Sequence, residues 1–84
     1  MHQTLTLSDG TTLHVNSGTR VIYPSDFTEN KREIFVSGEL FADVAKDPDK
    51  PFIISAGDVH VQVLGTKFNL RAYENIETVE VALV

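Results

Sequence analysis

The fold is decided by residues 59–72, whose sequence is VHVQVLGTKFNLRA. Apolar and polar residues alternate along this stretch, which is the two-residue period of a strand with one buried face. The valines before Gly65 occupy odd positions, whereas the apolar residues after it, beginning with Phe68, occupy even positions. A straight strand would turn one of these sets out to water. We therefore expect a β-bulge, a sharp corner or a tight turn at Gly65, because glycine adopts positive φ at low steric cost.

Similar alternating runs occupy most of the remaining chain, and turn signals rich in Gly, Pro, Asn and Asp separate them. The expected strands cover residues 4–7, 12–15, 19–23, 33–37, 39–46, 52–55 and 78–84. No segment keeps a helical period. The expected fold class is all-β, a small antiparallel β-sandwich or β-roll, with a double-stranded β-helix-like roll as the alternative. The last apolar run reaches the end of the chain, so we expect a C-terminally truncated domain that continues in further strands.

Two short segments are informative beyond their period. Residues 33–46 are apolar on both faces, because Phe35 and Phe41 have the opposite parity to Ile34. This pattern is expected of a strand between two layers or of one that faces a partner. In the polar segment 25–32, Phe27 is expected to anchor the loop to the core, and the pair 31–32, Lys-Arg, is expected to be a charged loop end.

Composition bounds the class of protein. The chain has 84 residues, enough for one domain, and its 42% hydrophobic and 23% charged residues indicate a globular one. The formal net charge of −5 argues against nucleic acid and anionic membrane surfaces as partners. The absence of cysteine excludes disulfides and thiolate zinc sites. No apolar run is long enough to span a bilayer.

No constellation of residues predicts catalysis. The serines at positions 17 and 37 lack the Gly-x-Ser-x-Gly pattern of a nucleophile elbow, and no pair of carboxylates stands out. His14 and His60 both have outward parity, and neighbouring strands would let them bind a metal with Asp58 or Glu80 as a third ligand. The simpler interpretation is that both histidines face solvent. We therefore expect no enzyme, no catalytic residue, no cofactor and no metal ligand.

Several segments, in order along the chain, resemble the periplasmic domain of the FecR family. The strongest is VQVLGTKFNL at 61–70, and others are LSDGT at 7–11, VNSGT at 15–19, REIFVSGELFADVAK at 32–46 and VEVALV at 79–84. The resemblance implies that residues 1–84 are a fragment of a FecR-type periplasmic β-domain. It implies structural rather than catalytic roles for the motif positions, which are Gly38, Val61, Val63, Gly65, Phe68 and Asn69. It assigns no partner-contact residues.

The resemblance also implies a role. Family members resemble single-pass inner-membrane regulators, or anti-sigma factors, of an extracytoplasmic-function sigma factor. The implied partner of the periplasmic part is the signalling domain of a TonB-dependent outer-membrane transporter. The sigma factor would be reached only through a cytoplasmic segment outside this chain. We also expect that an exposed edge strand could form a homodimer. The alternative function, prompted by His14 and His60, is a small-ligand or metal-binding cupin-like β-roll.

Overall fold

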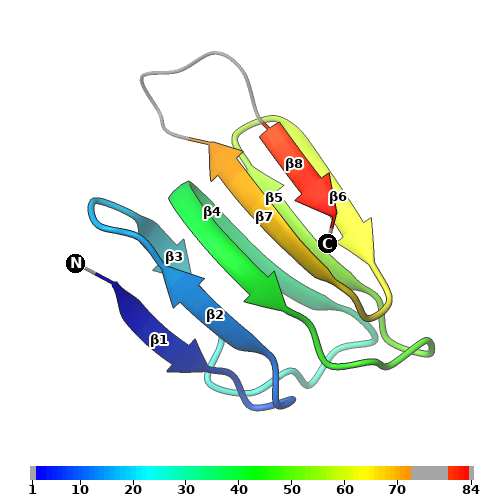
Figure 1. Ribbon diagram of the computed structural model, residues 1–84. Helices are drawn as coiled ribbons and strands as arrows, with labels where there is room; N and C mark the ends of the chain where they lie inside the picture. Colours follow the sequence, from blue (N-terminus) through cyan, green and yellow to red (C-terminus); the bar gives the residue numbers. More distant parts are fainter. Residues whose placement is uncertain (1, 73–79, 84) are drawn as a thin grey trace.

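The computed structural model describes residues 2–72 and 80–83, and all regular structure in them is β-strand (Figure 1). The strands are β1 (Gln3–Thr6), β2 (Thr12–Val15), β3 (Arg20–Ile22), β4 (Arg32–Asp43), β5 (Phe52–Ala56), β6 (Val59–Val63), β7 (Lys67–Ala72) and β8 (Glu80–Leu83). The predicted all-β class is confirmed. The start and end of the last expected strand, residues 78, 79 and 84, lie outside the described residues. No helix in the described part is long and apolar enough to cross a membrane.

The long strand β4 belongs to two sheets. Its second half pairs with β2 and β7, which gives sheet A the order β1-β2-β4-β7-β8. Its first half pairs with β3 and β5, which gives sheet B the order β3-β4-β5-β6. The two sheets share one core, so β4, rather than the stretch 59–72, is the central element of the fold (Figure 1).

Gly38 lies where β4 passes from one sheet to the other. Its φ of +136° is a backbone conformation that favours glycine. A Cβ at this position would lie 2.6 Å from the Thr19 Cα, so no side chain fits. Thr19 closes this bend, because its Oγ1 accepts the Glu39 amide hydrogen at 2.9 Å and donates to the Glu39 carbonyl at 3.1 Å. The bend therefore requires both a glycine and the threonine that packs on it.

One pair of strands departs from the expected antiparallel arrangement. The first half of β4 pairs with β5 in parallel, with Arg32 opposite Phe52 and Phe35 opposite Ser55. Parallel neighbours need a long crossover connection. Here the second half of β4, in sheet A, and residues 44–51 provide it. The chain thus makes one turn through both layers, as in a roll.

The core lies between the sheets and follows the predicted alternation. Even-numbered residues of β4 face inward both before and after Gly38, which is itself even-numbered. The bend at Gly38 therefore does not shift the alternation of inward and outward side chains. The buried apolar residues come from both layers, and they include Leu13, Val15, Ile34, Val36, Leu40, Ala42, Phe52, Ile54, Phe68 and Leu70. Phe35 is exposed and Phe41 is partly exposed. Of the two expected explanations for this pattern, a position between two layers is wrong for the described structure, and a face turned toward a partner stays a prediction.

The expected change of phase at Gly65 is a sharp corner. The strand before it, β6, pairs in sheet B, and the strand after it, β7, pairs in sheet A. Val63 packs against the core and Phe68 is fully buried, so apolar side chains from both sides of the corner reach the same core, whereas Val59 at the start of β6 is 42% exposed. The reason for glycine differs from the prediction. Gly65 does not have positive φ, and it is needed because a Cβ would collide with the backbone of Lys46.

Candidate functional site: an apolar groove beside strand β3

A buried arginine organises the end of the molecule that carries the groove. Arg32 is only 1% exposed, so the expectation of a charged loop end is wrong. Its Nη1 donates to the Asp9 carboxylate and to the Ala45 carbonyl, each at 2.7 Å, and its Nε donates to the Lys50 carbonyl at 2.7 Å. Arg32 has the inward parity of Ile34. That parity was the signal in the sequence that could have placed it in the interior.

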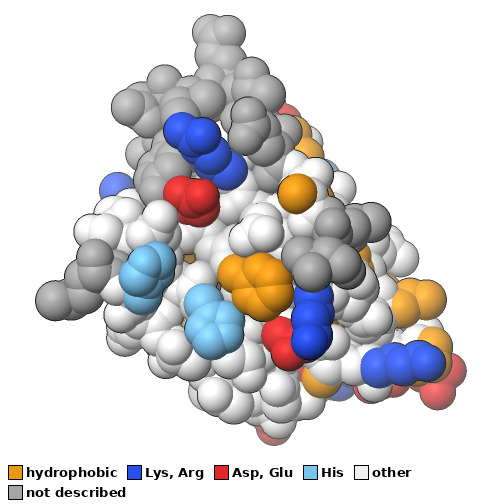
Figure 2. Space-filling model, viewed as in Figure 1, with side chains coloured by type: hydrophobic (Ala, Val, Ile, Leu, Met, Phe, Trp, Pro, Cys, Tyr) orange, Lys and Arg blue, Asp and Glu red, His pale blue; other side chains and the backbone are white. Residues whose placement is uncertain are grey.

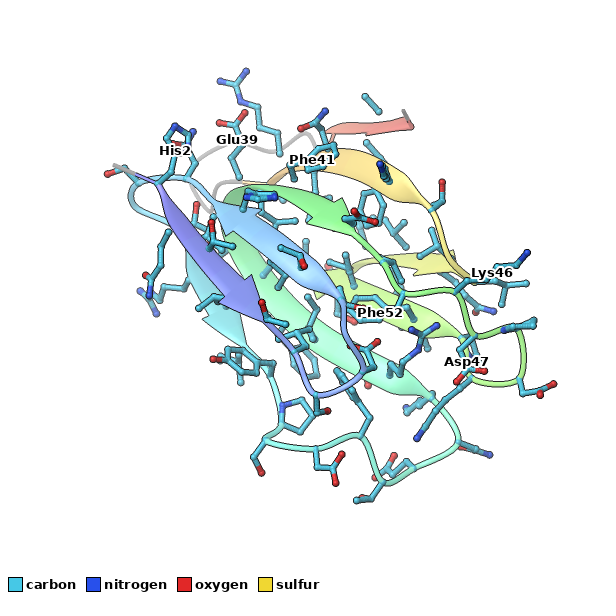
Figure 3. The ribbon with its side chains drawn as sticks, turned by 60° about the horizontal axis from the view of Figure 1, so that its bottom comes forward. His2, Glu39, Phe41, Lys46, Asp47 and Phe52 are labelled. Atoms are coloured by element: carbon cyan, nitrogen blue, oxygen red, sulfur yellow. The ribbon has the colours of Figure 1, made fainter. Side chains whose placement is uncertain are left out.

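Arg32 supports the groove through two aromatic rings, that of Phe52 and that of Phe27, which is part of the groove lining. Its guanidinium lies 5.2 Å from the centre of the Phe52 ring, which sits between the sheets (Figure 3). Phe27 meets Phe52 edge-on with ring centres 6.0 Å apart. The Lys50 ammonium also donates to the Phe27 carbonyl at 2.5 Å. Phe27 is buried, which confirms that it anchors its loop.

The groove itself lies between the loop after β3 and the outer face of β4. Its volume is about 380 Å³. Three of its apolar walls are exposed: Ile22 by 67%, Phe35 by 49% and Tyr23 by 42%. Ile22 and Phe35 are direct neighbours in the β3–β4 ladder. Large apolar side chains gathered at one exposed place are typical of an interaction site.

Charged groups also line the groove, and acidic ones predominate. They are Asp26, Glu29, Glu33 and Lys31. The Lys31 ammonium lies 3.3 Å from the Glu33 carboxylate. Hydrogen bonds to Glu33 from Ser55 and Lys31 lower the pKa of its carboxyl, which therefore stays ionised near neutral pH.

A series of hydrogen bonds extends from Glu33, in the lining of the groove, across sheet B. The Ser55 hydroxyl donates to the Glu33 carboxylate at 3.0 Å, and Ser55 Oγ lies 2.7 Å from His60 Nδ1. Because the hydroxyl hydrogen goes to Glu33, the oxygen accepts from the imidazole. A nucleophilic serine needs the opposite polarity, in which the hydroxyl donates to histidine. Ser55 is also buried, with only 3% of its surface exposed. These hydrogen bonds therefore serve as a structural connection between β4, β5 and β6.

The two histidines of the alternative hypothesis do not meet. His14 lies on β2 in sheet A, where it is 3.3 Å from Thr4 Oγ1 and its ring packs 5.9 Å from that of Phe41. His60 lies on β6 in sheet B, and these strands do not pair. Within residues 2–72 and 80–83, no three His, Cys, Asp or Glu side chains are placed to hold a metal ion.

The remaining motif residues lie away from the groove. Val61 and Val63 are half-buried on β6, and Asn69 is exposed on β7, opposite Phe41 in the ladder. On the face of sheet A, charged and histidine side chains are scattered, and hydrophobic side chains form only a small patch between them (Figure 2). None of the motif residues lines the groove. Sequence reasoning singled out Phe35 but missed the groove itself, because most of the other lining residues come from a polar loop and from the outward side of β3.

Comparison with known proteins places the chain in a family. Two crystal structures of a proposed anti-sigma factor from Parabacteroides distasonis superpose with a TM-score of 0.89 and 40% sequence identity. The match covers 99% of this chain but 43% of that protein, so this chain spans less than half the length of that relative. None of the curated proteins matches significantly. The profile of the family described as FecR protein matches residues 2–83. The chain therefore belongs to the FecR family.

Proposed function

We propose that this chain is a protein-docking module of a regulator that acts on a sigma factor. Membership of the FecR family and the likeness to a proposed anti-sigma factor support this role. In this proposal the chain does no catalysis. It recognises another protein, and the signal reaches the sigma factor through other parts of the regulator.

The finer assignment follows the family resemblance. We propose that the module lies in the periplasm as part of a single-pass inner-membrane protein. Its partner is the signalling domain of a TonB-dependent outer-membrane transporter. Binding at this domain would relay the state of the transporter to an extracytoplasmic-function sigma factor in the cytoplasm.

One observation carries the proposal for the docking surface. The groove is lined by three exposed side chains, those of Ile22, Tyr23 and Phe35. The hydrogen bond from Lys50 to the Phe27 carbonyl holds another part of its lining in place. Beside it, β3 pairs only with β4 among the described strands, so its outer edge is open to a further strand. An apolar groove next to an open sheet edge offers both side-chain pockets and backbone hydrogen bonds to a partner.

Binding to the cognate signalling domain tests the proposal directly. We expect calorimetric heat and NMR shift changes on mixing the two proteins. Phe35→Ser should weaken binding by at least about tenfold, as is usual for a central aromatic contact. Phe41→Ser is the matched control, because Phe41 lies on the same strand with the same outward parity but in sheet A. No heat and no shift change, or equal effects of the two variants, would count against the proposal.

A second copy of the chain is the competing occupant of an open edge. Among the described strands, β1, β3, β6 and β8 each pair on one side only. Sedimentation of the chain alone measures directly whether two copies form a dimer. A dimer that Phe35→Ser dissociates would assign the groove to self-association instead of to a transporter domain.

A further inference from the structure

We infer that the groove binds an extended segment of its partner whose groove-facing positions, every second residue, carry apolar side chains followed by lysine or arginine. This inference rests on the proposed function and deepens it, because it states the chemistry of the recognised segment. Three independent features of the groove support it: its shape, its charge and its rigidity.

The shape of the groove fits a strand. Ile22 and Phe35 lie side by side across β3 and β4 and project from the same face of sheet B. A partner strand places every second side chain on one face. Apolar residues at alternate positions would therefore contact these two side chains while the partner backbone follows the open edge of β3. Pro24 lies just past β3, which has three residues, so the ladder is short and side chains must supply much of the affinity.

The charge of the groove selects lysine or arginine at further positions on the same face of the segment, because Glu33 has the same outward parity as Phe35. Three carboxylates, those of Asp26, Glu29 and Glu33, stand against the single ammonium of Lys31. Lys31 is already engaged with Glu33, whereas the described structure gives Asp26 and Glu29 no ion pair. Lysine or arginine on the partner would neutralise this excess, and aspartate or glutamate would be repelled. Complementary charge also orients the partner and accelerates its encounter.

The groove is held open before anything binds. Phe27 forms part of its lining, and its position is determined by the Phe52 ring and by the hydrogen bond from Lys50. Lys50 is in turn connected to the buried Arg32 through its carbonyl. A surface that is already ordered loses little conformational entropy on binding, which favours recognition of a short segment.

Synthetic peptides test the chemistry without knowledge of the natural partner. The probe is the eight-residue peptide VSVSKSKS, which places two valines and two lysines on one face of an extended strand, titrated into the ¹⁵N-labelled chain. The comparison peptides are VSVSESES, in which glutamate replaces lysine, and VKVKSSSS, in which the lysines lie on the face opposite the valines. We expect the lysine peptide VSVSKSKS to shift amide signals of residues 20–35 and to bind at least about tenfold more tightly than the glutamate peptide.

Charge reversal on the chain provides the matched test. Glu29→Lys should weaken binding of the lysine peptide by about three- to tenfold, because an exposed attraction becomes a repulsion. Asp43→Lys is the control, since it makes the same charge change at an exposed site at the far end of β4. Ile22→Ser gives a second disruption of the groove, and circular dichroism verifies that every variant is folded.

The outcomes separate the inference from the proposed function. Equal binding of the lysine and glutamate peptides, shifts outside the groove, or equal effects of Glu29→Lys and Asp43→Lys would overturn the inference. If the cognate signalling domain binds but ignores Glu29→Lys and Ile22→Ser, the function stands and the inference fails. If the lysine peptide binds in the groove but the signalling domain does not bind, the inference stands and the proposed partner is wrong.

Discussion

Arg32 Nη1 lies 2.7 Å from Asp9 Oδ2, and this buried ion pair joins the start of β4 to the turn between β1 and β2. The same carboxylate accepts the Thr11 hydroxyl hydrogen at 2.7 Å, and the Ala45 amide donates to that hydroxyl oxygen at 3.1 Å. Turns and loops that are far apart in the sequence are thus connected through one charged cluster. Phe52 contacts both Arg32 in this cluster and Phe27 in the lining of the docking groove. The shape of the groove therefore depends on the same interactions that stabilise the domain.

Removing the arginine should strongly destabilise the chain. In Arg32→Met the Asp9 carboxylate loses its counter-ion and the Ala45 and Lys50 carbonyls lose their donor. We expect the free energy of unfolding, measured by urea denaturation, to fall by about 3–5 kcal/mol. Arg20→Met is the control, because Arg20 is exposed and its loss should change stability by at most about 0.5 kcal/mol. Similar losses in both variants would contradict the central role of the buried pair.

The same pair should make stability depend on pH in the acid range. Partial burial pushes the pKa of Asp9 upward, but hydrogen bonds from Thr11 and Arg32 outweigh burial and hold it below its ordinary value. An unfolded aspartate has a pKa of about 3.9, so between the two values the unfolded chain binds more protons. The stabilisation from Asp9 is therefore fully present above that unfolded value and is lost as pH falls through the lower folded pKa.

Urea denaturation between pH 7 and pH 3 measures this effect. Asp9→Asn should lower stability at neutral pH and should lose less of its remaining stability on acidification than the natural chain. Asp43→Asn, at an exposed carboxylate, should keep the natural pH dependence. An Asp9→Asn profile as steep as that of the natural chain would show that Asp9 does not contribute to the acid sensitivity.

The bend in β4 should tolerate no side chain. Gly38→Ala combines a φ of +136° with a collision against Thr19, and we expect a loss of at least about 3 kcal/mol in the free energy of unfolding. Gly57→Ala is the matched control, since Gly57 has a φ of +59° but open space around its Cα. Its cost should be only about 1–2 kcal/mol, from the left-handed conformation alone. Equal costs would mean that the contact with Thr19 is unimportant.

The switch of side chains at the corner can be tested with two phenylalanines. Phe68 and Phe41 lie on neighbouring strands of sheet A, but Phe68 is fully buried whereas Phe41 is on the outer face. Phe68→Ala should cost about 3–5 kcal/mol, because it leaves a cavity in the core. Phe41→Ala should cost about 1 kcal/mol. Thermal or urea unfolding that ranks the two variants in reverse would invalidate the assignment of faces after Gly65.

Much of the architecture was predictable because it depends on local alternation. Burial of every second residue along β4 and β7 follows from the parity that most of their apolar residues share, whereas three successive residues of β5, Ile54, Ser55 and Ala56, are all buried. The two interruptions that matter, at Gly38 and Gly65, were visible as glycines between alternating runs. The burial of Phe27 followed from a lone aromatic residue in a polar loop.

Contacts between distant segments decided the rest. The parallel pairing of β4 with β5 depends on β4 crossing into the second sheet, which no local pattern reveals. Gly65 is required by the nearby backbone of Lys46 rather than by its own φ. The groove exists because a polar loop folds back beside the outward side of β4.

The sequence by itself therefore determined the strands, their inward faces and the all-β class, because these depend on periodicity over a few residues. Only the tertiary structure decided the burial of Arg32 and the place of the groove. An arginine reads as a surface residue until a carboxylate 23 positions away and several carbonyl oxygens surround it. The physical reason is that the cost of burying a charge is met by partners that only folding brings together.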